Sequence, residues 1–125
     1  MPRTGNYYYV EIKPSHIDWG GYRHTETRDR IAGEAYVKIP RHYAEEFNIR
    51  LGSCYTAIFA DGYGSFTARA SGNSFAGDVY AKQFQGNGDL KAFGYWYQSV
   101  GAKIGDMVKV EFVSESEILF THVPR

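Results

Sequence analysis

The sequence predicts a mainly β (α+β) fold, a closed or nearly closed barrel of about seven strands with one or two short helices. Eleven tyrosines and eight phenylalanines favour strands, because flat rings pack well on a pleated surface. Fourteen glycines and many polar turns divide the 125 residues into short segments, several of which alternate apolar and polar side chains. This length is close to the commonest size of a domain, so we expect one domain over residues 1–125.

The N-terminal half is expected to contain two strands and a helix. Residues 6–13 and 33–40 alternate between two faces, as half-buried strands do. Pro40 ends the second strand and suits the first position of a helix, where its missing N–H has no partner to lose. Tyr43 and Phe47 then stand four residues apart, which places both rings on one face of the short helix that follows.

The C-terminal half is predicted to be richer in strands. Segments with strand-like composition lie at 53–60, 65–70, 78–84 and 90–96, with a clear hairpin at 107–123. A polar, glycine-rich excursion, QGNGD, separates the third and fourth of these segments. A short helix is expected within 97–106, before the final hairpin. The chain shows no internal repeat or linker, so the prediction remains a single barrel.

Cysteine usage and hydropathy limit the environment of the protein. The single cysteine, Cys54, excludes an intramolecular disulfide and suits a reducing compartment. Its apolar neighbours predict that it is a small buried side chain. The first residues lack the apolar run of a signal peptide, and no segment approaches membrane-spanning length. We therefore expect a cytoplasmic protein with no membrane partner.

The formal net charge is zero, but the charges are unevenly distributed. Residues 104–125 hold four acids (Asp106, Glu111, Glu115 and Glu117) against Lys109 and Arg125, which gives 2 − 4 = −2 and leaves +2 for the rest. A neutral total is therefore compatible with one basic face.

Metal-dependent chemistry has weak support. Glu11 and Lys13 form a carboxylate–lysine pair, and Asp78, Asp89 and Lys91 could form another, as in nucleases that use magnesium. The first pair lacks an upstream acid and the second lies in a loop, so solvated charges are the expected outcome. The four histidines show no metal-ligand spacing. They are His16, His24, His42 and His122. We predict no metal and no cofactor.

Planar hydrogen-bond donors are concentrated in two long polar segments. The first, 16–30, is far longer than the usual hairpin loop of about two to five residues. Its candidate contact residues are Trp19, Tyr22, Arg23, His24, Thr25, Arg28 and Arg30. The second segment offers Lys82, Gln83, Gln85, Asn87 and Lys91. Arginine can bind guanine O6 and N7, amides can bind adenine N6 and N7, and lysine holds phosphates. The two segments therefore favour double-stranded DNA as the partner.

The order of these elements resembles the B-three-type DNA-binding pseudobarrel, a fold of plant transcription factors and of the effector domains of EcoRII-type restriction endonucleases. The stretches that carry the resemblance are YYYVEIK, GEAYVKIP, RHYAEEFNI and KIGDMVKVEF. The first three look most like the restriction-enzyme branch, whose first arm is also glycine-rich and precedes a tyrosine-containing strand ending in Ile-Pro. The resemblance covers nearly the whole chain.

The resemblance implies a seven-stranded open pseudobarrel that binds a short CCWGG-like duplex site sequence-specifically, through two arms in the major groove and without cutting it. Such an effector module would act on a nuclease domain in the full-length bacterial chain, and we expect a monomer. By position, the first arm covers 19–30 and is followed by Tyr36, the second covers 80–91, and Arg69 joins the candidate DNA contacts. The second arm departs from its relatives, which are rich in Lys and Arg there.

Two other functions are compatible with parts of the sequence. A small metal-dependent nuclease would use the carboxylate–lysine pairs, and magnesium-dependent cleavage would reveal it. The stretch VKIPRHYAEEFNIRLG also suggests a swapped-hairpin transcriptional regulator of the AbrB kind. Those regulators are much shorter and obligately dimeric, so a monomer would count against that hypothesis.

Overall fold

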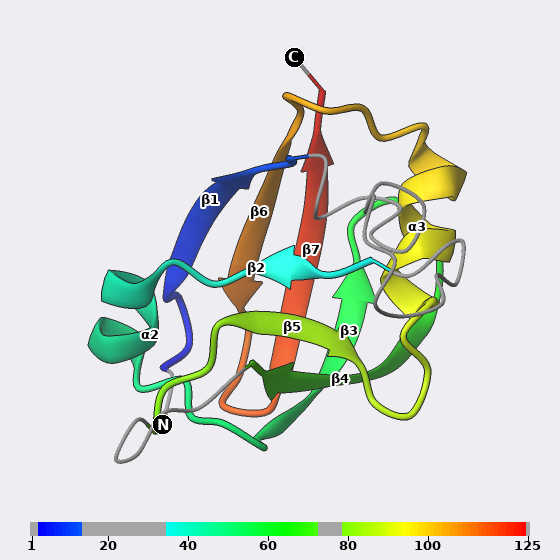
Figure 1. Ribbon diagram of the computed structural model, residues 1–125. Coiled ribbons are helices and arrows are strands. Elements are labelled where there is room, and N and C mark those ends of the chain that lie inside the picture. Colours follow the sequence, from blue (N-terminus) through cyan, green and yellow to red (C-terminus); the bar gives the residue numbers. More distant parts are fainter. Residues whose placement is uncertain (1–2, 14–34, 73–78, 125) are drawn as a thin grey trace, which may run out of the picture.

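The computed structural model describes residues 3–13, 35–72 and 79–124. The elements in chain order are β1 (Tyr7–Glu11), β2 (Val37–Lys38), α2 (Arg41–Phe47), β3 (Cys54–Phe59), β4 (Ser65–Ser71), β5 (Gln83–Gly86), α3 (Ala92–Val100), β6 (Met107–Phe112) and β7 (Glu117–Val123). The strands form one seven-stranded sheet in the order β1-β6-β7-β3-β4-β5-β2 (Figure 1). Every neighbouring pair is antiparallel except β3 and β7. The mainly β fold with two short helices is the one that the sequence predicts.

Apolar residues alternate with polar ones along the strands, and the apolar face of each strand points into the barrel. The inward side chains of β6 are Val108, Val110 and Phe112, all fully buried, and the predicted hairpin with β7 is confirmed. The same alternation buries Tyr8 in β1 and leaves Tyr7 and Tyr9 exposed on the outside. Burying one face of each strand removes apolar surface from water and specifies the register, because a slip of one residue would turn every side chain to the other face.

The barrel stays open between its two edge strands. The edges are β1 and β2, and a side chain rather than a backbone ladder connects them. The Tyr8 hydroxyl donates a hydrogen bond to the backbone oxygen of Lys38 at 2.9 Å, and its ring stacks on Tyr43 of α2. Burial raises the pKa of Tyr8 well above its ordinary value, so this hydroxyl stays a neutral donor at physiological pH. The predicted open pseudobarrel is thus confirmed, with one tyrosine across its seam.

The helix α2 begins and ends close to the predicted residues. It starts at Arg41, directly after Pro40, and buries Ala44 and Phe47. Asn48 ends it in the left-handed conformation, with φ 57° and ψ 51°. Asparagine tolerates this backbone better than most residues with a side chain, which explains why the helix stops there.

The prediction for 90–96 is wrong, because this segment enters α3 instead of a strand. Phe93, Trp96, Tyr97 and Val100 recur at the spacing of one helical face, and the first three are buried. Their rings pack into the core, where Trp96 lies 4.7 Å from Phe59 between centroids. The aromatic content that favoured a strand reflects a helix that is buried against the sheet. The helix expected within 97–106 thus begins earlier than predicted and ends at Val100.

Cys54 also differs from its prediction. It is exposed at the start of β3, whereas Tyr55, Ala57 and Phe59 point inward. The alternation of the strand therefore decides its burial, and the apolar character of its neighbours is misleading. No helix in the described part of the chain is long and apolar enough to cross a membrane.

Candidate nucleic-acid interface

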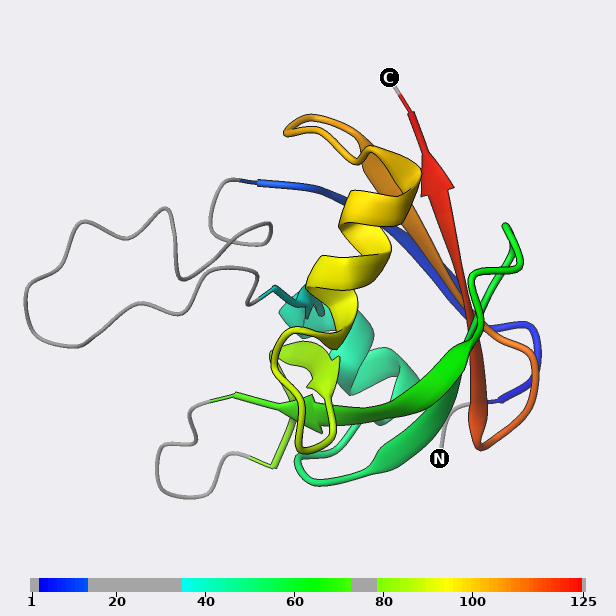
Figure 2. The ribbon, with the colours of Figure 1, turned by 90° about the vertical axis from the view of Figure 1, so that its right-hand side faces the viewer.

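The outward side chains of β2, β4 and β5 form a surface that we call the polar face. It consists of Lys38, Ser65, Thr67, Arg69, Ser71, Gln83 and Gln85. The residues that alternate with them point into the barrel, among them Val37, Ala68 and Phe84, which are fully buried. In Figure 2 β2 and β5 lie to the left of β6 and β7.

The register of the strands places these side chains in two rows. Arg69 is paired directly with Gln85 across β4 and β5. Gln83 is paired with Ser71 on one side and with Lys38 of β2 on the other. Side chains directly opposite one another in a sheet have Cβ atoms about 5 Å apart, so each row forms a continuous polar strip.

The two glutamines of β5 hold one another. The Nε2 group of Gln83 donates a hydrogen bond to Oε1 of Gln85 at 3.0 Å. Both side chains are partly exposed, and both backbones are held in ladders. We call these two residues the glutamine pair. A linked amide pair on a rigid strand presents fixed donors and acceptors instead of two independently rotating side chains.

Charged side chains are distributed unequally between the two halves of the sheet. The strands β2 to β5 contain two charged side chains, Lys38 and Arg69, and both are cations. Both are exposed, and neither makes an ion pair with any residue that the structure describes. By contrast β1, β6 and β7 carry Glu11, Glu111 and Glu117 against Lys109 alone. Among the described strands, the cations without an acidic partner therefore lie on the polar face.

Seven residues predicted for the first arm lie outside the described residues: Trp19, Tyr22, Arg23, His24, Thr25, Arg28 and Arg30. Tyr36, which follows that arm, is partly buried next to β2, and its backbone oxygen accepts a hydrogen bond from the Tyr97 hydroxyl at 2.9 Å. Arg69, Gln83 and Gln85 belong to the polar face. Their predicted roles as DNA contacts stay predictions.

The second predicted arm, 80–91, is not an extended arm in the structure. Its first part bridges to Arg50 and continues into β5, which pairs on both sides. Its second part is a tight turn, in which Asn87 donates its backbone N–H to Thr67 and Lys91 donates its backbone N–H to Oδ1 of Asp89. The backbone N–H groups of Asn87 and Lys91 are thus hydrogen-bonded to nearby residues.

Gly86 makes this turn possible. A Cβ atom at Gly86 would overlap the backbone oxygen of Asp89 and lie 2.7 Å from the Cβ of Ala92. The chain therefore folds back closely enough to connect β5 directly to α3, and the Asn87 backbone is bonded to Thr67 of the polar face. The backbone N–H of Lys82 donates to Ser71 of the same face, and the side-chain stem of Lys82 packs against Gly72.

Sequence reasoning missed four residues of the polar face, which are Lys38, Ser65, Thr67 and Ser71. Each occupies an outward position of a strand that the alternation had already predicted. Reading the outward positions of each strand together with the polar loops would have included them.

Within residues 3–13, 35–72 and 79–124, the residues considered for metal chemistry do not form a cluster. Among the described residues, no group of three or more His, Cys, Asp or Glu side chains could hold a metal ion. Asp78 lies outside the described residues, and Asp89 serves the turn before α3. His122 is a hydrogen-bonding histidine, whose Nε2 lies 2.7 Å from Oδ2 of the buried Asp106.

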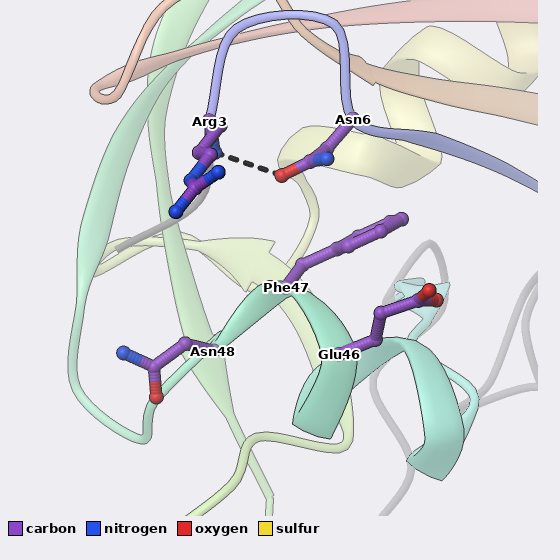
Figure 3. Close-up of a pocket in the computed structure, with 5 residues that line it drawn as sticks. All are labelled: Arg3, Asn6, Glu46, Phe47 and Asn48. Atoms are coloured by element: carbon purple, nitrogen blue, oxygen red, sulfur yellow. Dashed lines mark hydrogen bonds between the residues drawn. The ribbon is translucent and has the colours of Figure 1, made fainter.

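A separate pocket of about 350 Å³ lies beside α2 and the N-terminal turn. Its lining residues are Arg3, Asn6, Glu46, Phe47 and Asn48 (Figure 3). Figure 3 shows the charged side chains of Arg3 and Glu46 on opposite sides of Phe47, and the backbone N–H of Arg3 donates to Oδ1 of Asn6. The groups have mixed charge and belong to none of the predicted contacts.

Comparison with known proteins shows similarity at the level of structure. No protein-family model matches the sequence, and no curated protein matches it. Among solved structures, a chain of the Arabidopsis FUS3–DNA complex has a similar fold, with a TM-score of 0.55 and 15% sequence identity. The match covers 93% of this chain and 94% of that chain. At this sequence identity the match shows only that the two chains share a fold. That fold is the B-three-like pseudobarrel that the sequence predicts.

Proposed function

We propose that the protein binds double-stranded DNA, with the polar face as part of the contact surface. One observation carries the proposal: the exposed cations of β2 to β5 lie on one side of the sheet with no acid among those strands. The shared fold adds support, because the similar chain comes from a DNA complex and the match spans nearly the whole of both chains.

The chemistry of the polar face suits a duplex. Lys38 and Arg69 supply positive charge for phosphate oxygens, and arginine can alternatively bind O6 and N7 of guanine. Ser71 and Thr67 supply hydroxyl groups, which commonly contact the backbone. Few cations and a neutral total predict a shallow dependence of affinity on salt, so binding relies more on base contacts than on charge.

We propose further that the protein is a non-catalytic recognition module of the EcoRII type, with a CCWGG-like site and a nuclease domain as its partner in the full-length chain. The sequence resemblance from YYYVEIK to RHYAEEF supports this narrower assignment. The first arm, 19–30, would read bases in the major groove. A swapped-hairpin regulator fits less well, because a single chain supplies all seven strands of the sheet.

Selection from randomised duplexes in the presence of magnesium tests the proposal. We expect enrichment of one short site, recovery of intact DNA, and a complex with one protein chain per site. Cleavage of the recovered DNA would favour a nuclease instead. Absence of any enriched sequence, with equal weak binding to all duplexes, would contradict sequence-specific recognition.

A further inference from the structure

We infer that the glutamine pair, Gln83 and Gln85, reads one adenine through the major groove. The inference rests on the proposed DNA binding and names the base that this part of the surface recognises. It starts from the hydrogen bond between the two amides and from the rigidity of the strand that carries them.

The backbone of the glutamine pair is fixed on both sides. Gln83 pairs with Ser71 of β4 and with Lys38 of β2, and Gln85 pairs with Arg69. The residue between them, Phe84, is fully buried. The two side chains therefore leave the sheet in the same direction from a strand that cannot shift without breaking the ladders and the core.

The hydrogen bond decides which ends of the amides remain for a ligand. Gln83 uses Nε2 to donate, so its Oε1 keeps its acceptor capacity. Gln85 uses Oε1 to accept, so both hydrogens of its Nε2 remain. The Gln83 oxygen and the Gln85 amino group are thus the two amide groups that this hydrogen bond leaves entirely unused.

Adenine is the base whose major-groove edge matches this pattern. It offers an acceptor at N7 and a donor at the N6 amino group, next to each other. Guanine offers two acceptors, thymine one acceptor and a methyl group, and cytosine one donor. A donor from Gln85 to N7 and an acceptor from Gln83 to N6 would therefore select adenine.

The cations next to the glutamine pair can hold the two amides against the base edge in the major groove. Arg69 is directly opposite Gln85, and Lys38 is directly opposite Gln83. Contacts from these two side chains to phosphates would fix the register of the duplex over the amides. Phosphate contacts position a protein, and base contacts specify the sequence.

Base analogues test the inference on the selected duplex. Each adenine is replaced singly by 7-deazaadenine, which lacks the N7 acceptor, or by purine, which lacks the N6 amino group. At one position we expect each analogue to weaken binding by wild-type protein about tenfold. Gln85→Met should abolish the response to 7-deazaadenine, and Gln83→Met the response to purine, both measured by fluorescence anisotropy.

Two further variants make the test specific. Gln98→Met changes an exposed glutamine on α3 and should keep both responses. Gln85→Glu keeps the side-chain shape but replaces the donor with an acceptor, so it should lower affinity for adenine at that position. Thermal unfolding monitored by circular dichroism checks that each variant folds.

Two results would overturn the inference. If wild-type protein binds its duplex tightly and both methionine variants keep every analogue response, the glutamine pair does not read adenine, while DNA binding by the protein stands. If the wild-type protein binds no duplex above background, the inference fails together with the proposed function.

Discussion

Two halves of the sheet share an inward pattern and differ in what they present outward. On β1 and β6, as on β4 and β5, the inward residues are buried except for the half-buried Val10 and Phe66. Outward, Tyr7 and Tyr9 are exposed, and the Lys109 ammonium lies 3.4 Å from a Glu111 carboxylate oxygen and 5.2 Å from the Tyr7 ring centroid. The polar face has no such pairing for Lys38 or Arg69 among the described residues.

The difference shows where the fold leaves freedom for function. Inward residues stabilise both halves by burial, which is the larger energetic contribution. Outward cations that already have an acidic neighbour gain little from a phosphate, because they must give up that partner. Cations without one gain more, so Lys38 and Arg69 are better placed for DNA than Lys109.

The largest expected effect tests the turn that supports the polar face. Gly86→Ala should lower the free energy of unfolding by about 3 kcal/mol, because the new methyl group would overlap the Asp89 backbone. Gly88→Ala is the matched control in the same turn. It has open space but a φ of +78°, so it should cost about 1 kcal/mol. Urea unfolding measures both, and equal stability of the two variants would contradict the close approach.

The next largest effect on stability is expected at the seam between the edge strands β1 and β2. Tyr8→Phe removes the hydroxyl that donates to the Lys38 backbone oxygen and should cost about 1–2 kcal/mol. Tyr9→Phe changes the neighbouring exposed tyrosine and should change stability by less than about 0.5 kcal/mol. If the two variants have the same midpoint in urea, the seam does not depend on this hydrogen bond.

The same tyrosine predicts a loss of stability in alkali. Burial raises the pKa of Tyr8 and of Tyr97 above the ordinary value near 10. The unfolded chain releases these protons first, so their contribution is complete below about pH 10 and is lost as the pH rises through the folded pKa values. The free energy of unfolding should fall from about pH 10 upward, and less steeply in Tyr8→Phe. An identical pH profile for both proteins would exclude a role for Tyr8.

The smallest effect compares single cations on the two halves. Lys38→Gln should reduce the slope of log affinity against log salt by about one, because one phosphate contact is lost. Lys109→Gln should leave the slope unchanged, since its ammonium already pairs with Glu111. Titrations at several salt concentrations measure both slopes. A change at Lys109 as large as that at Lys38 would remove the distinction between the halves.

The sequence predicts the strands well where apolar residues alternate strictly, as in β1, β6 and β7. It fails at α3, because aromatic rings suit a strand and a buried helix alike and the spacing of Phe93, Trp96 and Tyr97 is visible only over a whole turn. Cys54 fails for a related reason: strand alternation, and not the character of its neighbours, places it outside.

The candidate site was predicted in part. The amides of 82–91 were identified from their chemistry, but their arrangement depends on pairing with β4 and β2, which are distant in sequence. Lys38 was not predicted as a contact residue because it lies next to Gln83 only in the folded sheet, where the two residues are paired. The first arm was identified from its length and its arginines, and its residues lie outside the described ranges.

The most direct test of the polar face as a DNA contact compares two double variants with the same change of net charge. Lys38→Glu with Arg69→Glu reverses the charge of the polar face. Lys103→Glu with Lys109→Glu makes the same reversal outside it. Binding to the selected duplex should fall by about a hundredfold or more in the first variant and by only a few-fold in the second. Equal losses in the two variants, with both folded, would contradict the assignment.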